Sequence, residues 1–339
     1  MRVICLFYRK RHTFLRGKTE KADGGKEKYT CVFRADGSAV NTKEKGKIIL
    51  YHLIVNPDAG KHKTLRAARS VADYFDEREE EYVIHEMTSK QILRSTINDL
   101  SQGGGERNNI IVVGGDGTMH AVLNSLADVN SVNIGLIPAG TGNDFAASAK
   151  IPTDPKAAAQ IVLNCEAKDT DYLEVGGVRC MNVGGLGIDV DVLKRYNKSR
   201  KIHGKLKYLR CLIQSILHFK GNDILIESDG RSEKHRAFLA VACNGSQIGG
   251  GIKICPAANP TDGLLDVCVV DMVRGLKVIG AFSKLMKGKI LEFNKTTHFL
   301  CERVKFFIEG GATVQLDGEL YDNLDFDARI MTGLKFYRP

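Results

Sequence analysis

The sequence predicts two domains: an α/β nucleotide-binding domain with a mostly parallel, doubly wound sheet, and a mainly antiparallel β-sandwich. Residues 47–167 alternate apolar strand-like runs with segments of helical spacing, which is the pattern of βαβ units. Residues 168–339 instead contain short alternating segments separated by turn clusters, and this pattern favours a sandwich. A chain of 339 residues is long enough for two domains with cores of their own.

A basic segment precedes the two domains. Residues 1–47 hold 13 lysines and arginines against 5 acidic residues, whereas the rest of the chain holds 36 against 35. The net charge of +9 therefore resides mainly in this segment, and the nearly neutral remainder argues against nucleic-acid binding. We expect residues 1–46 to be a poorly ordered extension, with an electrostatic arm for anionic lipid as the alternative.

Cysteine spacing and hydropathy bear on the cellular compartment. The nine cysteines include no C-x-x-C pair, so free thiols in a reducing cytoplasm are the simplest interpretation, and structural zinc is disfavoured. The longest apolar runs, 48–55 and 237–243, are far shorter than the about 18–20 residues of a membrane span. No apolar stretch follows the basic N-terminal residues, so we expect no signal peptide and a cytoplasmic protein.

Strands and helices alternate through the first domain. We expect strands at 48–55, 82–87, 110–113 and 133–137, and helices at 63–80, 90–100 and 119–126. Ligands of parallel sheets bind beyond the carboxyl ends of the strands. Three turns at that edge carry glycine, at 56–61, 114–118 and 139–143, and Thr88 sits at the fourth. This convergence predicts a ligand site at that edge.

The second domain is predicted from shorter segments. We expect strands at 172–175, 224–228, 237–243, 264–270, 304–308 and 324–330. Two helical stretches, 204–219 and 276–290, each combine an apolar stripe with lysines. Core-facing helices with a solvated basic face are the expected interpretation, and a cleft or interface that meets lipid is the alternative.

The segment Gly114-Gly-Asp-Gly-Thr118 joins a buried strand to a helix. Such a turn directs backbone N–H groups and the helix dipole at a point where a phosphate can bind. Asp116 lies inside the turn, and its carboxylate would repel a phosphate unless a cation offset the charge. The segment therefore predicts a phosphate site with a metal-directed carboxylate, while plain turn-making remains the alternative for each glycine taken alone.

Three motifs together resemble the diacylglycerol kinase catalytic family, particularly its soluble bacterial lipid kinases. They are Asn56-Pro-x-x-Gly60, Gly114-Gly-Asp-Gly-Thr118 and Gly140-Thr-Gly-Asn-Asp-Phe145. The second motif alone is also similar to motifs of NAD kinases and phosphofructokinases, whereas the third motif and a C-terminal Asp317-Gly-Glu319 narrow the choice to lipid kinases. The resemblance spans about 47–339 and covers the two-domain layout.

The resemblance implies ATP as co-substrate and Mg²⁺ as metal. Asp116 would hold the Mg²⁺ directly or through water, since this ion is usually bound by one or two carboxylates plus phosphate oxygens. Backbone amides, hydroxyls and small residues would bind the triphosphate without a Walker lysine. The nucleotide-binding residues would be Asn56, Pro57, Asp58, Ala59, Gly60, Thr88, Gly114, Gly115, Asp116, Gly117, Thr118, Met119, His120, Ala121 and Thr141.

His120-Ala121 departs from the family pattern, which usually has Asn-Glu at this place. A neutral histidine can replace asparagine as a donor, but Ala121 has no carboxylate. We expect the departure to alter nucleotide affinity or preference and to leave the kinase assignment intact.

The segment 314–319 is the second expected site. An Asp-Gly hairpin turn is the simple interpretation of Asp317-Gly318. The resemblance instead implies that Glu319 is the general base that takes the proton of the acceptor hydroxyl, with Asp317 positioning it or helping to bind magnesium.

A third segment, Asn259-Pro-Thr-Asp-Gly-Leu264, has the composition of a turn. The resemblance implies a structural Mg²⁺ there, with Asn259, Asp262 and the carbonyl of Leu264 as ligands. The glycine runs at 184–187 and 249–251 are expected to allow close approach or movement of the chain.

These observations lead to one main functional hypothesis. We expect an ATP- and Mg²⁺-dependent lipid kinase acting on the hydroxyl of a diacylglycerol-like lipid, reached from the inner face of the membrane. A kinase for phosphatidylglycerol, a sphingoid base or NAD is the first alternative, and a catalytically silent nucleotide- or lipid-binding relative is the second. An edge strand of the sandwich leaves a homodimer open.

Overall fold

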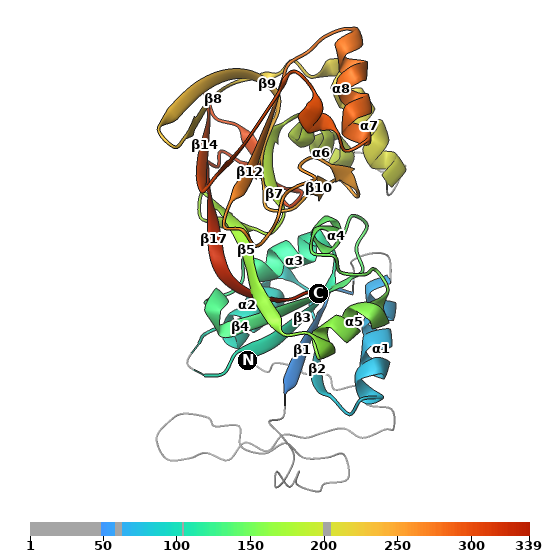
Figure 1. Ribbon diagram of the computed structural model, residues 1–339. Helices are drawn as coiled ribbons and strands as arrows, with labels where there is room; N and C mark the ends of the chain where they lie inside the picture. The colour runs from blue at the N-terminus through green and yellow to red at the C-terminus, as the bar shows by residue number, and fades with distance from the viewer. Residues whose placement is uncertain (1–48, 58–62, 104, 199–204) are drawn as a thin grey trace, which may run out of the picture.

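The computed structural model describes residues 49–57, 63–103, 105–198 and 205–339. They form two lobes, one above the other (Figure 1). The expected extension at 1–46 and three expected nucleotide-binding residues, Asp58, Ala59 and Gly60, lie outside the described residues.

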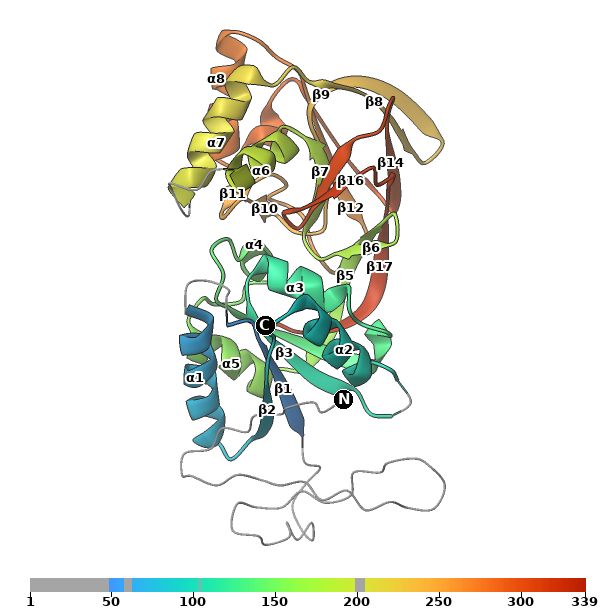
Figure 2. The same cartoon turned by 180° about the vertical axis from the view of Figure 1, so that it is seen from behind.

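The first lobe is the expected α/β domain. Four parallel strands lie in the order β2-β1-β3-β4, namely β1 (Leu50–Val55), β2 (Glu81–Glu86), β3 (Asn108–Gly114) and β4 (Val132–Pro138). Helices α1 (Lys63–Asp76) and α5 (Pro155–Asn164) pack together on one face, and α2 (Lys90–Leu100) and α3 (Asp116–Leu123) pack together on the other (Figure 2). The doubly wound sheet predicted from the alternating pattern is confirmed.

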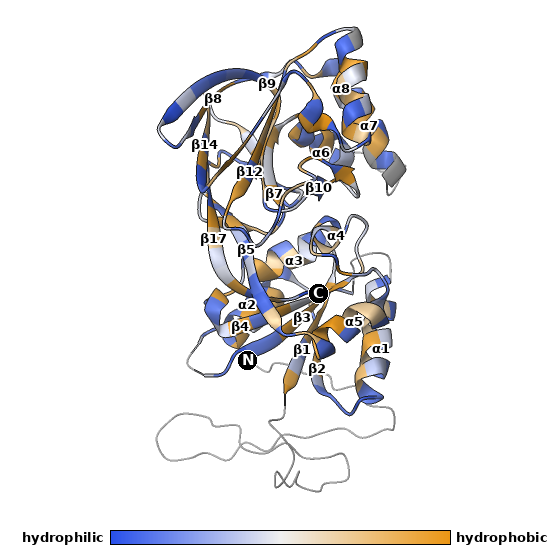
Figure 3. Ribbon diagram, in the orientation of Figure 1, coloured by the Kyte–Doolittle hydropathy of each residue, from blue (hydrophilic) through white to orange (hydrophobic). Residues whose placement is uncertain are grey.

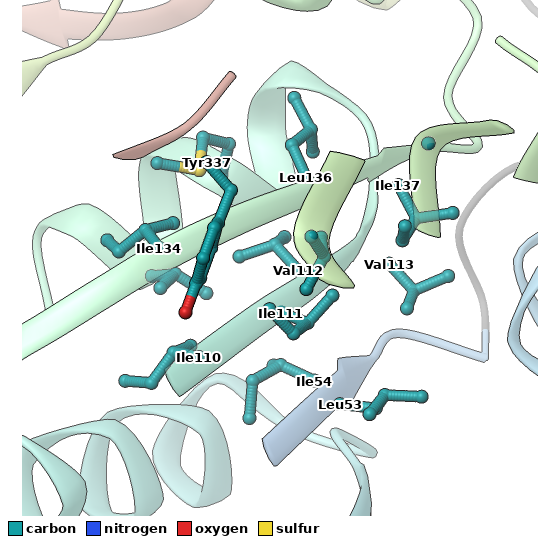
Figure 4. Packing of buried hydrophobic residues seen from close by; sticks show 14 of the residues in the cluster. Leu53, Ile54, Ile110, Ile111, Val112, Val113, Ile134, Leu136, Ile137 and Tyr337 are labelled. Carbon is teal, nitrogen blue, oxygen red and sulfur yellow. The ribbon is translucent and has the colours of Figure 1, made fainter. Parts of the chain in front are cut away.

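The core of this lobe explains the continuous apolar runs of β1 and β3. A strand covered on both faces buries every side chain, so its sequence does not alternate. Ile54, Ile111 and Ile134 are fully buried and lie together between the helical layers (Figure 4). Each buried isoleucine stabilises the fold by roughly 2 kcal/mol.

The second lobe is built from antiparallel strands. They are β6 (Val178–Cys180), β7 (Val183–Gly187), β8 (Asn222–Ser228), β9 (Arg231–Cys243), β10 (Gln247–Ile248), β11 (Ile252–Lys253), β12 (Leu265–Asp271), β13 (Thr296–Cys301), β14 (Arg303–Ile308), β15 (Thr313–Leu316) and β16 (Glu319–Asp322). Alternate residues of β12 face two different cores: Val267 lies in the sandwich interior, whereas Cys268 lies in a second apolar cluster. Residues of α7 (Lys205–His218) and α8 (Leu276–Met286) belong to that second cluster.

Two long strands join the lobes. β5 (Ala167–Val175) and β17 (Phe326–Tyr337) pair antiparallel, and the last part of β17 also pairs parallel with β4 (Figure 1). The sequence predicted a strand ending at residue 330. The structure continues it past a register shift between Met331 and Leu334, where Gly333 adopts φ 94°. Phe326 therefore lies in the sandwich core and Phe336 in the α/β core.

Several helices were absent from the sequence expectation: α4 (Asp144–Ser148), α5 and α6 (Ile188–Lys198), with the short 3-10 turns η2 (Val129–Ser131) and η3 (Ile290–Glu292). α5 carries a clear start signal, because the Asp154 side chain accepts a hydrogen bond from the N–H of Ala157 and Pro155 follows it. α1 ends at Asp76 rather than near residue 80, and Glu79 just after it has φ 59°. No helix of the described residues is long and apolar enough to cross a membrane.

Candidate active site

The glycine turn after β3 presents the start of a helix. α3 begins at Asp116 with Gly115 as its N-cap, so Asp116 is the first residue of the helix rather than part of a preceding loop. Backbone N–H groups in the first turn of a helix have no acceptor within that helix. In α3 the N–H groups of Thr118 and Met119 donate to the Gly115 carbonyl, both at 3.0 Å, so those of Asp116 and Gly117 remain for an anion placed beyond the carboxyl end of β3.

The glycine turn after β4 touches this one. A Cβ atom on Gly115 would lie 2.8 Å from the Cα of Gly140, and a Cβ on Gly140 would lie 2.5 Å from the Cα of Gly115. The Asn143 side chain fixes the second turn by accepting a hydrogen bond from the Gly140 N–H at 2.9 Å. Because both positions need glycine, the two turns form one continuous floor of backbone.

A cavity of about 660 Å³ opens above this floor, between the lobes. Its volume lies in the range of small-molecule sites, about 300–1,000 Å³. Ten of the residues expected from sequence line it: Asn56, Thr88, Gly115, Asp116, Gly117, Thr118, Ala121, Thr141, Asp317 and Glu319.

The other expected residues lie elsewhere. Gly114 packs behind the turn, where a Cβ would lie 2.6 Å from the Cβ of Thr118. Met119 is 1% exposed in the α/β core, and Pro57 and His120 are also absent from the cavity wall. Asn259, Asp262 and Leu264 belong to a turn outside the cavity.

The cavity also contains polar residues that the sequence analysis did not assign: Lys90, Asp144, Asn182, Asp189, Tyr196 and Gln315. Asp144 stands in the Gly-Thr-Gly-Asn-Asp-Phe motif, so a signal for it was present. Asp189 follows the glycine run 184–187 and lies in the first turn of α6. Its sequence surroundings contain no comparable motif.

Asp116 and Asp144 form a pair of carboxylates. A Cβ on Gly142 would lie 2.9 Å from Oδ2 of Asp116 and 3.2 Å from Oδ2 of Asp144, so both carboxylates lie against this glycine. Burial, and next the charge of Asp144, raise the pKa of Asp116 to about 6, although the Phe145 N–H donates to its Oδ1 at 3.2 Å. Two such carboxylates favour a bound cation.

Asp144 also connects the lobes. Its Oδ2 accepts a hydrogen bond from the Gly250 N–H at 2.9 Å, and its Oδ1 accepts one from the Gly251 N–H at 3.0 Å. Both glycines lie in the hairpin between β10 and β11. The glycine run at 249–251 therefore approaches the first lobe closely, as expected from sequence.

Asp317 occupies the hairpin turn between β15 and β16, with φ 52° there and 87° at Gly318. Its buried carboxylate accepts hydrogen bonds from the N–H groups of Met181 and Asn182, both at 2.8 Å. Burial by itself raises the pKa of Asp317, but the hydrogen bond and charge of His120 and these N–H donors hold it below its ordinary value. Asp317 thus fixes the turn that carries Glu319.

His120 reaches from α3 to this turn. Its Nδ1 lies 3.0 Å from Oδ2 of Asp317, and its Nε2 lies 2.6 Å from the hydroxyl of Tyr321. A carboxylate only accepts, so Nδ1 carries the proton. The departure from the family pattern at His120 therefore forms a contact between the lobes.

Glu319 is exposed to the cavity at the start of β16. A Cβ on Gly117 would lie 3.3 Å from its Oε1. The Glu319 carboxylate therefore stands over the first turn of α3, and a reacting group held at that turn would lie within its reach.

The turn at 259–264 is held by internal hydrogen bonds. The Thr261 hydroxyl donates to Oδ1 of Asn259 at 2.8 Å, and the Leu264 N–H donates to Oδ1 of Asp262 at 3.1 Å. Asp171, which sequence did not single out, accepts the Gly263 N–H at 2.8 Å. The oxygen-rich turn has the donor type that Mg²⁺ prefers.

Both lobes match known families. Residues 51–175 match the diacylglycerol kinase catalytic domain, and residues 182–334 match the YegS C-terminal NAD kinase beta sandwich-like domain. A diacylglycerol kinase of Mycobacterium tuberculosis is 31% identical over 229 residues, which cover 62% of this chain and 72% of the relative. A diacylglycerol kinase of Bacillus subtilis is 29% identical over 216 residues, covering 62% of this chain and 70% of the relative.

A solved structure shows the same fold. A diacylglycerol kinase from Bacillus anthracis superposes with a TM-score of 0.66 at 22% identity, covering 87% of this chain and 98% of the other. The family matches and the relatives at about 30% identity confirm the resemblance inferred from the glycine motifs. The chain belongs to the diacylglycerol kinase catalytic-domain family of lipid kinases, and it is a phosphotransferase.

Proposed function

We propose that this protein is an ATP- and Mg²⁺-dependent lipid kinase that transfers the γ-phosphoryl group to the hydroxyl of a diacylglycerol-like lipid. The observation that carries the proposal is the position of Glu319, a residue of the second lobe, over the first turn of α3 in the first lobe. A base and a phosphate-binding helix start lie on opposite walls of one cavity.

The triphosphate of ATP fits the floor formed by the two glycine turns. Gly115 and Gly140 allow a phosphate to approach backbone that carries no side chain, and the start of α3 provides N–H donors. Thr118 and Thr141 line the same part of the cavity and offer hydroxyls. Binding by such backbone donors needs no Walker lysine.

Asp116 and Asp144 have the donor set for Mg²⁺, which is held by one or two carboxylates together with phosphate oxygens and water. When bound, the ion would neutralise charge on the transferring phosphoryl group. The oxygens of the 259–264 turn would hold a second, structural Mg²⁺ outside the cavity.

Glu319 accepts the proton of the acceptor hydroxyl as that oxygen attacks the γ-phosphorus in line. Asp317 acts as a positioning residue, since its buried carboxylate fixes the turn through five donor groups, from Cys180, Met181, Asn182, Val183 and His120.

The lipid enters from a membrane surface in this proposal, at the inner face of the membrane. α7 and α8 lie side by side at the end of the second lobe in both views, and each helix mixes hydrophobic and hydrophilic residues (Figures 1 to 3). Leu217 is 73% exposed and Ile279 is 65% exposed. Lys277, Lys284 and Lys287 lie on or just after α8 and would meet anionic headgroups.

Phosphorylation of lipid in mixed micelles tests the proposal. With radiolabelled ATP and Mg²⁺, the wild type should label diacylglycerol, and Glu319→Gln should lose at least 100-fold in kcat while still binding ATP, since general-base catalysis contributes typically 10²–10⁴-fold. Glu302→Gln, an exposed glutamate outside the cavity, serves as the matched control.

Failure of the wild type to label any lipid would refute the proposal. If the protein labels another lipid from a total extract, the assignment as a lipid kinase stands and the acceptor is that lipid instead of diacylglycerol. If Glu319→Gln turns over as fast as the wild type, Glu319 is not the general base.

A further inference from the structure

A group of cysteine, aspartate and histidine side chains lies on the sandwich, away from the cavity. β9, β12 and β13 are neighbours in the sheet, with Asp266 opposite Cys243 and Cys268 opposite His298. Cys255 comes from the segment that follows β11. Three thiols, one carboxylate and one imidazole therefore come together from four separate segments.

The donor atoms are close together. The ligand atoms of Cys255, Asp266 and His298 all lie within 4.8 Å of one another, and Nε2 of His298 is 2.7 Å from Oδ1 of Asp266. The thiols of Cys243 and Cys268 are neighbours of the Cys255 thiol in the same buried cluster. No other group of three such side chains in the described part of the chain meets this distance.

Burial favours a closed site with one point of entry. Cys243, Cys255 and Cys268 are fully buried, and Asp266 is 3% exposed. The side chain of His298 is 30% exposed, so an ion from solvent reaches the group past this imidazole. Burying a carboxylate is costly unless a cation or several donors compensate for it.

We propose that Cys255, Asp266 and His298 form a binding site for a borderline-soft divalent cation of the Zn²⁺ class. Sulfur, imidazole nitrogen and carboxylate oxygen are the ligands that Zn²⁺ takes, in a tetrahedron with donors roughly 3.5 Å apart. The widest separations, at most 4.8 Å, would contract, and the 2.7 Å between Nε2 of His298 and Oδ1 of Asp266 would lengthen as the ion replaces their hydrogen bond. One of the two neighbouring thiols, Cys243 or Cys268, completes the tetrahedron. Mg²⁺ and Ca²⁺ are excluded as preferred occupants because they select oxygen ligands.

The cation would tie Cys255, and with it the turn at 259–264, to the central strands of the sandwich. Cys255 must lose its proton to solvent for binding, so the affinity falls as the pH is lowered. The absence of a C-x-x-C pair argued against zinc from sequence alone. That argument covers ligands close together in the chain and misses a group assembled across a sheet.

Cobalt substitution tests the proposal without any use of kinase activity. Protein is purified in reductant without chelator, its zinc content is measured by mass spectrometry, and metal-free protein is titrated with Co²⁺. The wild type should hold one equivalent and show a near-ultraviolet thiolate-to-cobalt band together with tetrahedral visible bands. The band intensity reports how many thiolates bind.

Four variants complete the design. Cys255→Ser and His298→Gln should each lose the bound zinc or weaken Co²⁺ binding at least tenfold, and Zn²⁺ should no longer raise their Tm. Cys211→Ser, a buried thiol of the same apolar cluster, and His218→Gln, at the end of α7, should behave as the wild type. His298 is partly exposed, so its variant keeps the test valid if Cys255→Ser does not fold.

Two outcomes would overturn the proposal. The first is that the wild type binds neither Zn²⁺ nor Co²⁺, or that Cys255→Ser and His298→Gln both bind these ions as tightly as the wild type does. The second is that protein isolated without reductant contains a disulfide between Cys255 and either Cys243 or Cys268, while the reduced protein binds no metal. The thiols would then act as a redox pair rather than as metal ligands.

Discussion

Asp189 is a carboxylate whose burial has a predictable cost. It lines the cavity, its Oδ1 accepts the Val190 N–H at 2.9 Å, and burial raises its pKa to about 6, with Val190 and Gln315 lowering it only partly. A pKa raised above the unfolded value of 3.8 means that the folded state binds the proton more tightly. The stability that this proton contributes is present below pH 3.8 and is lost as the pH rises to 6.

Replacing Asp189 by asparagine should therefore stabilise the protein at pH 8 by up to about 3 kcal/mol, because about two pKa units no longer oppose folding. At pH 4 the effect should be near zero. Urea unfolding at the two pH values measures the difference. An equal change in the free energy of unfolding at pH 4 and pH 8 would show that burying the ionised Asp189 carboxylate does not destabilise the fold.

His120 is the second residue with a measurable role. His120→Ala removes the contacts to Asp317 and Tyr321 and leaves a buried carboxylate with fewer donors, so we expect a loss of about 2–4 kcal/mol. Tyr321→Phe removes one hydrogen bond and should cost about 1 kcal/mol. The pKa of Asp317 is lowered in the folded state, so its ionised carboxylate stabilises the fold at neutral pH. That contribution is lost in acid, as the pH falls below the ordinary aspartate pKa of 3.8. Denaturant titrations at pH 7 measure the free energy of unfolding of both variants. Equal losses in the two would contradict the larger contribution expected of His120.

At the scale of the secondary-structure elements, the close contact between the glycine turns after β3 and β4 holds the floor of the cavity together. Gly140→Ala would place a Cβ 2.5 Å from backbone, where nothing flexible can move aside. We expect the variant to weaken ATP binding more than tenfold, measured by calorimetry, and to lower Tm. Gly280→Ala is the control, since its Cβ meets nothing within 4 Å in α8 and should stabilise the helix by about 0.5–1 kcal/mol.

Local sequence signals were sufficient for most elements. α2 has the predicted bounds and Ser89 is its cap, because capping is decided within a few residues. The glycine turns around the cavity were also predictable, since a turn follows its own residues. The second half of β17 was not, because its pairing with β4 depends on residues about 200 positions away.

The same limit applies to the site. Asp116 and Glu319 could be named from motifs, and Asp144 stands in one of them, whereas Asp189 lies in no such motif and reaches the cavity only when the two lobes pack. His120 was expected to face the nucleotide. Its partner Asp317 lies 197 residues further along the chain, and no local pattern reveals such a contact. The roles of all these residues in catalysis remain predictions.

At the scale of the whole molecule, β17 couples the lobes. Phe336 is fully buried and its ring meets that of Phe145 edge-on, with centroids 5.4 Å apart. Phe336→Ala should destabilise the protein by about 3–5 kcal/mol. Hydrogen exchange should show the loss in β3 and β4 as well as in β17, and a loss confined to the sandwich would contradict the coupling.

The course of β17 also has a consequence for synthesis on the ribosome. The nucleotide-binding lobe begins near the start of the described chain, yet one of its strands, β17, is translated after the whole second lobe. N-terminal domains commonly fold while the rest of a chain is still being made. Here the first lobe cannot be completed until β17 has been made, so a chain terminated before β17 would lack a strand of the first sheet and would release no partly active kinase.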